Sequence, residues 1–263
     1  MVTVNDVTQM MFRWAPPELA MDWDNVGLLV GRGDREVHRV LVALDVSPDV
    51  AAEAAETGTD LIVSHHPVMN IRWHAQQMQT LREDTRLGGL LTELVKRDIS
   101  AMCMHTNLDA AEGGVNDVLA DLFGIRQRTA FADGCGRVGD IDPITVPELA
   151  ALAQHKLAAL CNAPDTGTAV QVKFADTGKP VRRLAVISGA GGSLFAEAIA
   201  EGADCLLTGE ANHHHALDAK RLGLSLIAAG HYATEFPVTA AVAAALRAAL
   251  PELEVLVSTE NRD

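Results

Sequence analysis

Leu61-Ile62-Val63-Ser64-His65-His66-Pro67 is the stretch from which the fold can be read. Its first residues favour a buried strand, and the proline prevents the chain from continuing as regular sheet or helix. An apolar run at residues 39–45 predicts another strand, and residues 48–56 between the two predict a short helix. This is the pattern of a βαβ unit with two adjacent histidines at the carboxyl end of its second strand. Ligands of open α/β sheets bind at that edge.

The histidine pair has two interpretations. Side chains alternate in direction along extended chain, so we expect His65 and His66 to point different ways. Each would then serve one of two neighbouring metal ions. Alternatively, the pair only solvates the end of a strand, which is the more ordinary role for two histidines taken alone.

Composition limits the class of protein. With 263 residues, 48% of them hydrophobic, the chain can form one large or two small domains with a substantial core. The net charge of −14, the single tyrosine and the three tryptophans argue against a nucleic-acid partner. Four cysteines without a C-x-x-C pair favour reduced thiols. We see no signal peptide and no apolar run of membrane-spanning length, so we expect a soluble cytoplasmic protein without a membrane partner.

An internal repeat relates the two halves of the chain. Four residues recur 144 positions later: Arg39 as Arg183, Gly58 as Gly202, Asp60 as Asp204 and, as another hydroxyl residue, Ser64 as Thr208. The next predicted strand of each half ends at His105-x-x-x-Asp109 or at His231-x-x-x-Glu235, and these motifs are 126 positions apart. Chance similarity between two ordinary βαβ units is the alternative, and it explains the matching polar ends less well.

The repeat predicts an α/β fold of two similar, duplicated α/β domains, with mostly parallel central sheets flanked by helices. We expect the first domain to comprise residues 1–127 and 230–263 and to carry most of the candidate ligands. The second domain would comprise residues 128–229. Residues 76–97 predict a long amphipathic helix interrupted at Gly88-Gly89, and residues 131–142, rich in Gly and Asp, predict no regular element.

Each half presents imidazoles and carboxylates beyond its strand ends. The first half offers His65, His66, His105 and Asp109, and the second offers Glu210, His231 and Glu235. Imidazole together with carboxylate suits zinc, iron, manganese or nickel. In hydrolytic sites a carboxylate can bridge two such ions held about 3.5–4 Å apart.

Two of these acids also have a purely structural interpretation. Asp109-x-x-Glu112 fits a capping box ahead of a helix. Glu235 would favour the macrodipole if it lay in the first turn of a helix. Their repetition after histidines at strand ends favours the ligand interpretation.

Two further motifs carry weaker predictions. Consecutive helical residues face about 100° apart, so His213-His214-His215 cannot converge on one ion. We expect a solvated helix start there, with at most one of the three, together with Glu210, lining a pocket. The loop Ser188-Gly189-Ala190-Gly191-Gly192-Ser193 either cradles an anion with its backbone amides or forms a tight turn, and both interpretations stay open.

A set of ordered motifs resembles the GTP cyclohydrolase 1 type 2 homologues, also called Nif-three-like proteins. The motifs are Trp23-Asp24-Asn25-Val26-Gly27, Ser64-His65-His66-Pro67, His105-Thr106-Asn107-Leu108-Asp109, Gly136-Arg137-Val138-Gly139, Thr208-Gly209-Glu210 and Gly230-His231-Tyr232-Ala233-Thr234-Glu235. The resemblance covers nearly the whole chain and is to the short form of the family, without a middle insert domain. It implies two similar α/β domains, in agreement with the repeat.

The resemblance also implies a site. The metal ligands of the family correspond to His65, His66, Asp109, His231 and Glu235, with two divalent ions per chain and Glu235 bridging them. His105 is not among the usual ligands, and its place in the repeat predicts a neighbouring catalytic role, such as a proton shuttle. Family members form ring-like hexamers, so we expect a homo-oligomer. Phe236-Pro237 departs from the glycine-containing turn of many relatives.

Two hypotheses of different classes follow from the resemblance. The first is a dinuclear metal-dependent hydrolase acting on a small cyclic or nucleotide-like substrate, with GTP ring opening suggested by the family name alone. The second is a metal-binding scaffold or regulatory interaction protein without turnover. A plainer alternative is an α/β protein whose histidines only solvate strand ends.

Overall fold

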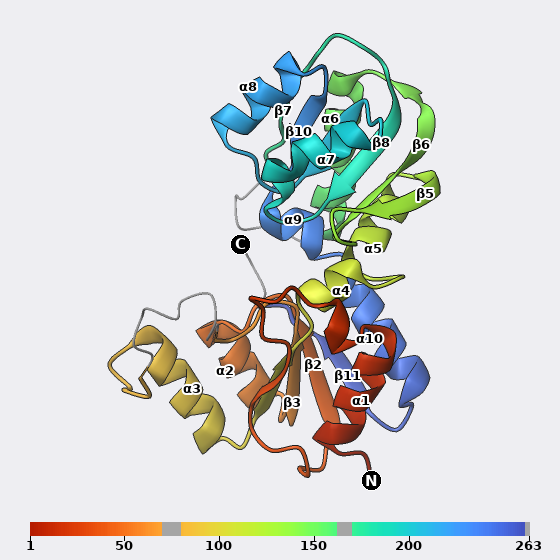
Figure 1. Cartoon of the computed structure of the whole chain (residues 1–263). Helices are drawn as coiled ribbons and strands as arrows, with labels where there is room; N and C mark the ends of the chain where they lie inside the picture. The colour runs from red at the N-terminus through yellow and green to blue at the C-terminus, as the bar shows by residue number, and fades with distance from the viewer. Residues whose placement is uncertain (70–79, 162–169, 261–263) are drawn as a thin grey trace. The chain divides into compact units, whose positions relative to one another are not determined.

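The chain forms two compact units, each with its own sheet (Figure 1). The computed structural model describes residues 1–69, 80–161 and 170–260. One unit comprises residues 1–111 and 239–262, and the other comprises residues 112–238. The predicted fold class is confirmed: both units are α/β, with sheets flanked by helices.

The first unit is built on a five-stranded sheet with the order β1-β4-β3-β2-β11. Its strands are β1 (Gly27–Val30), β2 (Arg39–Ala43), β3 (Leu61–Ser64), β4 (Ser100–Cys103) and β11 (Glu254–Val257). All run parallel except β1, which pairs with β4 in the antiparallel sense. The central strands are almost wholly buried, as expected for a parallel sheet that is covered on both faces.

Helices cover both faces of this first sheet. On one side lie α2 (Pro48–Glu56) and α3 (Arg86–Lys96), and on the other α1 (Val4–Trp14) and α10 (Val238–Ala249) (Figure 1). Two short helices, η1 (Pro17–Leu19) and α4 (Thr106–Ala110), pack against each other. Helix α1 begins at a capping box in which the Thr3 and Asp6 side chains each accept a backbone N–H of the other residue.

The second unit has a six-stranded sheet with the order β5-β6-β8-β9-β10-β7. Its strands are β5 (Arg126–Phe131), β6 (Gly136–Ile144), β7 (Lys173–Ala175), β8 (Val181–Ile187), β9 (Cys205–Thr208) and β10 (Ser225–Ala228). β8, β9 and β10 are parallel, whereas the other three strands pair antiparallel. The parallel part of the sheet therefore corresponds to β2, β3 and β4 of the first unit.

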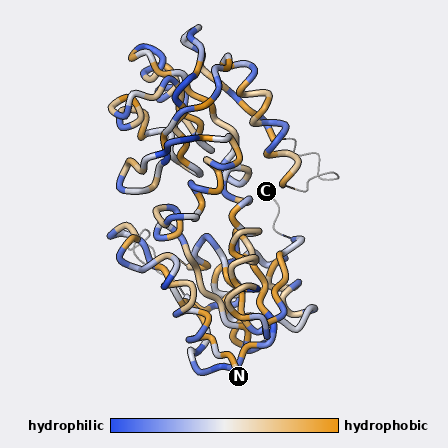
Figure 2. Tube along the Cα trace, turned by 90° about the vertical axis from the view of Figure 1, so that its right-hand side faces the viewer, coloured by the Kyte–Doolittle hydropathy of each residue, from blue (hydrophilic) through white to orange (hydrophobic). Residues whose placement is uncertain are grey.

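Two separate cores hold helices against this second sheet. One core joins the sheet to α5 (Val115–Leu122), α6 (Val146–Leu160) and α9 (His231–Glu235). The other joins the opposite face to η2 (Gly191–Leu194), α7 (Phe195–Ala200) and α8 (His213–Arg221). Along the Cα trace of each unit, hydrophobic and hydrophilic stretches alternate (Figure 2). None of the described helices combines the length and the apolar character needed to span a membrane.

Matching hydrogen bonds make the repeat visible in three dimensions. The Asp60 carboxylate accepts the backbone N–H groups of His38 and Arg39, at 2.7 and 3.0 Å. Asp204 accepts those of Arg182 and Arg183, both at 2.9 Å. Each aspartate thus fixes the start of the strand beside its own, so the repeated residues are the ones that set the strand register.

Three details differ from the sequence prediction. Residues 126–144 form the hairpin β5–β6, although no element was predicted over residues 131–142. Helix α3 runs through Gly88 and Gly89 without a break; a Cβ on Gly88 would lie only 2.2 Å from the carbonyl oxygen of Arg82, so the glycine permits close approach of neighbouring backbone. The helix predicted over residues 76–97 also begins late: residues 80–85 are not helical and α3 begins at Arg86, while residues 76–79 lie outside the described residues.

The boundaries of the compact units also differ from the predicted domains. The prediction assigned residues 112–127 and 230–238 to the first domain, whereas the second unit contains both. The reason is packing: α5 contacts β6 and β8, and α9 contacts α5 and α6. His231 and Glu235 therefore belong to the second unit, while β11 returns to the first unit by pairing with β2.

Candidate metal centre

Three imidazoles gather at the carboxyl edge of the first sheet. His65 and His66 follow the last residue of β3, and His105 stands between β4 and α4. The ring centroids of His65 and His66 are 4.9 Å apart, and that of His105 lies 5.2 and 5.5 Å from them. One ring nitrogen of each histidine lies within 4.8 Å of those of the other two, so the group could hold a metal ion.

The expected divergence of His65 and His66 does not occur. Strand β3 ends at Ser64, and both histidines lie in a bend where the alternation of extended chain no longer applies. The backbone N–H groups of the two residues donate to the carbonyls of Ala43 and Leu44, which fixes the bend against β2. The prediction was wrong because strand geometry ends at Ser64 and does not extend to the two histidines.

All three imidazoles are oriented through the same ring nitrogen. Nδ1 of His65 lies 2.9 Å from the Met104 carbonyl oxygen, and Nδ1 of His66 lies 2.8 Å from the Asp45 carboxylate. Nδ1 of His105 lies 3.0 Å from the Asp24 carboxylate. A histidine that donates Nδ1–H to a carbonyl or carboxylate presents Nε2 as the free lone pair, which is the usual arrangement of metal-binding histidines.

Asp109 lies beside this group on α4. Its Oδ1 is 3.7 Å from Nε2 of His65, and its side chain is 14% exposed. The capping-box alternative is wrong: α4 contains Asp109, and the next helix, α5, has Gly114 at its N-cap. The first unit thus brings together every one of the four ligand-type residues predicted for the first half of the chain.

The second unit carries a smaller group on α9. Nε2 of His231 lies 3.2 Å from Oε2 of Glu235, and its Nδ1 lies 3.4 Å from Oε2 of Glu210. The Glu235 side chain is 6% exposed and that of Glu210 is 61% exposed. Glu235 is the last residue of the short helix, so the macrodipole alternative, which needs a first-turn position, does not apply.

The Ser188–Ser193 loop is a tight turn that packs against this second group. Three of its amides have acceptors within the unit: Ser188 donates to Asn116 Oδ1, Gly189 to Thr234 Oγ1 and Gly192 to the carbonyl of Glu210. Gly189 has φ of +58°, and a Cβ there would lie 2.1 Å from Oε1 of Glu235. The absence of a side chain at Gly189 therefore lets the Glu235 carboxylate approach the loop.

His213, His214 and His215 form the first turn of α8, capped by Asn212, whose Oδ1 accepts the N–H of His215. His213 lines a groove of about 320 Å³ beside β7 together with Lys173 and Phe174. Glu210 instead contacts His231.

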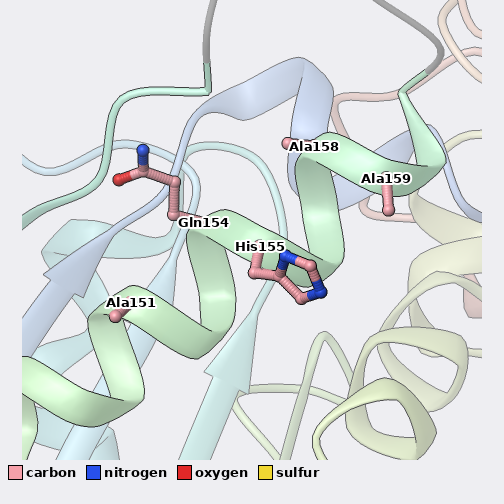
Figure 3. Close-up of a pocket in the computed structure, with 5 residues that line it drawn as sticks. All are labelled: Ala151, Gln154, His155, Ala158 and Ala159. Atoms are coloured by element: carbon pink, nitrogen blue, oxygen red, sulfur yellow. The ribbon is translucent and has the colours of Figure 1, made fainter.

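A second, shallow hollow on α6 is lined by Ala151, Gln154, His155, Ala158 and Ala159 (Figure 3). Of these lining residues, His155 alone offers a metal-type ligand.

Sequence reasoning missed Asp24 and Asp45, the acids that orient two of the histidines. Asp45 follows β2 at the same sheet edge as His65 and His66, so the rule that located the histidines was sufficient to find it. Asp24 lies in Trp23-Asp24-Asn25-Val26-Gly27, quoted above for the resemblance alone. Burial raises the pKa of Asp24, but hydrogen bonds from His105 and Thr106 outweigh burial and hold the pKa well below its ordinary value.

Comparison with known proteins identifies the family. The family model described as Duf34/NIF3 (NGG1p interacting factor 3) matches residues 2–263. The chain belongs to the Duf34/NIF3 family. A GTP cyclohydrolase 1 type 2 homologue of Clostridium perfringens is 31% identical over 99% of this chain and 97% of its own. One of Streptomyces coelicolor is 38% identical over 84% and 78%.

Solved structures of Duf34/NIF3-like proteins share the fold. The hypothetical protein SA1388 of Staphylococcus aureus is 28% identical with a TM-score of 0.85, covering 99% of this chain and 97% of its own. Reduced HcgD of Methanocaldococcus jannaschii is 27% identical with a TM-score of 0.80, covering 97% of each chain. The family assignment made from the ordered motifs is confirmed.

Proposed function

We propose that this Duf34/NIF3 protein is a dinuclear metal-dependent hydrolase. The observation that carries the proposal is the convergence of His65, His66 and His105, each held by a hydrogen bond at Nδ1, beside the Asp109 carboxylate. Histidines that only solvate a strand end need no such fixed orientation. Histidines that bind a metal do, because Nε2 must face the ion.

The proposed ligands are His65, His66 and Asp109 of the first unit and His231 and Glu235 of the second. Imidazoles are neutral ligands, so the first set brings one negative charge from Asp109 toward two divalent ions. Such ions take four or more donors each, and a carboxylate can serve both. The His231–Glu235 pair supplies the missing charge and donors, which is why we propose that both sets share one centre. Zinc, iron, manganese and nickel suit this donor set.

When bound, the ions would lower the pKa of a water and polarise the bond to be cleaved. In this proposal His105 accepts a proton at Nε2 and passes it to the leaving atom. The name of the relatives, GTP cyclohydrolase 1 type 2 homologue, suggests a cyclic C–N bond of a purine nucleotide as the target class. A small cyclic or nucleotide-like molecule is therefore our proposed substrate.

The test is turnover by protein purified without a histidine tag and reloaded with each metal, on a panel of nucleotides and cyclic amides. Glu235→Ala should abolish the activity, because it removes the proposed bridging carboxylate. Glu201→Ala, an exposed glutamate of the same unit, is the matched control and should stay active. Wild type and Glu235→Ala behaving alike on every substrate would contradict the proposal.

A second candidate, a metal-binding scaffold without turnover, draws support from the family description as an interacting factor. Pull-downs with wild type and His65→Ala distinguish the two functions. Metal retention with a stable partner and no turnover would favour the scaffold. Loss of that partner in His65→Ala would show that the interaction depends on the metal.

A further inference from the structure

Asp24 is a buried carboxylate next to His105, one of the three clustered imidazoles. It precedes β1, and the residue is 4% exposed. Four donors surround its two oxygens: the N–H of Asn25 at 2.8 Å, the N–H and O–H of Thr106 at 3.1 and 2.6 Å, and Nδ1 of His105 at 3.0 Å. An ionised carboxylate with this environment can only accept hydrogen bonds.

The acceptor character of Asp24 dictates the tautomer of its neighbour. For Nδ1 of His105 to bond to the carboxylate, the proton of the neutral ring must reside on Nδ1, which leaves the lone pair on Nε2. The Trp23 ring packs edge-on against His105, with centroids 6.0 Å apart at 75°, and limits rotation of the imidazole.

We propose that Asp24 is a positioning residue that fixes His105 as the Nδ1–H tautomer and so leaves the Nε2 lone pair free to accept a proton beside the proposed ligands His65 and His66. The proton-accepting role rests on the proposed function, whereas the assignment of the tautomer does not.

A merely structural role for Asp24 makes a different prediction. The segment before β1 is also fastened to α4 by Thr106, whose hydroxyl oxygen accepts the N–H of Met21 at 2.9 Å. If Asp24 only strengthens this attachment, its removal changes stability and leaves the state of His105 untouched. The two roles are therefore separated by observing the ring of His105 directly.

The experiment is long-range ¹H–¹⁵N correlation on ¹⁵N-histidine protein without metal, in alkaline solution, so that the neutral form of the ring is observed. The His105 signals are assigned by their loss in His105→Gln. Wild type should show the Nδ1–H tautomer. Asp24→Asn should switch it to Nε2–H, because the amide keeps its oxygen for Thr106 and turns its N–H₂ group toward Nδ1. Asp22→Asn removes the same charge from an exposed position two residues away, and it should leave the His105 tautomer unchanged.

Cation binding supplies the second measurement. Titration with Co²⁺, followed by its visible absorption, should give wild-type affinity in both Asp24→Asn and Asp22→Asn, because Asp24 acts on His105 and on none of the five proposed ligands. An Nε2–H tautomer in wild type, or an unchanged tautomer in folded Asp24→Asn, would overturn the assignment. If Asp24→Asn does not fold, the wild-type tautomer decides. If wild type binds no cation, the proposed function is wrong. The NMR measurement of the His105 tautomer still tests the role of Asp24 in that case.

Discussion

Among single residues, Gly189 matters to the group on α9 because its missing side chain leaves room for the Glu235 carboxylate. Gly189 combines a positive φ with direct contact to the Glu235 carboxylate. Gly202 has a similar φ of +73°, but no neighbouring atom lies within 4 Å of a Cβ built there. The pair therefore separates the cost of backbone strain from the effect on the carboxylate.

Gly189→Ala should lower both stability and cation affinity. The left-handed backbone costs a residue with a Cβ roughly 1–2 kcal/mol, and the new methyl group must displace Oε1 of Glu235. Gly202→Ala should lose a similar amount of stability and keep its cation affinity. Urea unfolding and Co²⁺ titration of both variants measure the two effects. Equal cation affinity in Gly189→Ala and wild type would show that the loop does not position Glu235.

Residue types at strand ends indicated the candidate ligands, but their environments were not predictable from sequence. Asp45 could have been predicted in the same way as His65, because it also follows a strand at the carboxyl edge of the sheet. Asp24 was not, because it meets His105 across 81 residues of chain through a contact that no local pattern encodes. The assignment of all five proposed ligands to one centre remains a prediction.

At the scale of elements, a buried ion pair joins α5 to β6. Asp117 accepts hydrogen bonds from Nε and a terminal nitrogen of Arg137, at 2.9 and 3.1 Å, and the two side chains are 4% and 6% exposed. Arg137 also donates to the carbonyls of Gly134 and Gly136. This pair gives the motif Gly136-Arg137-Val138-Gly139 a structural role in closing the β5–β6 hairpin.

Asp117→Ala should destabilise the protein by about 3–5 kcal/mol at pH 7, because it leaves the Arg137 guanidinium buried without its carboxylate. Asp121→Ala is the control: the side chain is 69% exposed, and loss of its pair with Arg128 should cost about 1 kcal/mol or less. Urea unfolding of both variants and wild type measures the difference. A loss below that of the control would contradict the structural role.

The Asp117 contribution should also depend on pH. Burial raises the pKa of Asp117, but hydrogen bonds from Arg137 and Gly113 outweigh burial and set the folded-state pKa below the ordinary 3.8. The stabilisation is therefore complete above pH 3.8 and is lost as the pH falls through the lower folded-state value. The stability difference between wild type and Asp117→Ala should shrink below that pH. A difference that is constant down to complete acid unfolding would contradict this linkage.

Apolar runs were predictable as strands, whereas the β5–β6 hairpin was not. The runs that became β2, β3, β4, β8, β9 and β10 are mostly apolar and mostly buried, as parallel strands covered on both faces are. Their charged residues, Arg39, Arg182 and Arg183, lie near the starts of β2 and β8. β5 is mostly exposed and alternates weakly, so its sequence resembles a loop. Its place beside β6 is supported by tertiary contacts such as the Arg128–Asp117 ion pair, at 3.0 Å, which joins β5 to α5.

At the scale of the whole molecule, the repeat was readable because the same residues fix the register in both sheets. The boundaries of the two units were harder to predict from the sequence, because they depend on which sheet α5 and α9 pack against. Family resemblance further predicts a ring-shaped homohexamer. Light scattering on the purified chain should give about six times its mass of 27.9 kDa. A mass of one chain at all concentrations would contradict that prediction.

We propose that both units contribute ligands to one pair of ions. Anomalous diffraction from crystals of tag-free protein grown with Mn²⁺ or Zn²⁺ is the decisive experiment. We expect two peaks per chain about 3.5–4 Å apart, with His65, His66 and Asp109 together with His231 and Glu235 within bonding distance. A single peak held by one unit alone, or no peak beside these histidines, would contradict it.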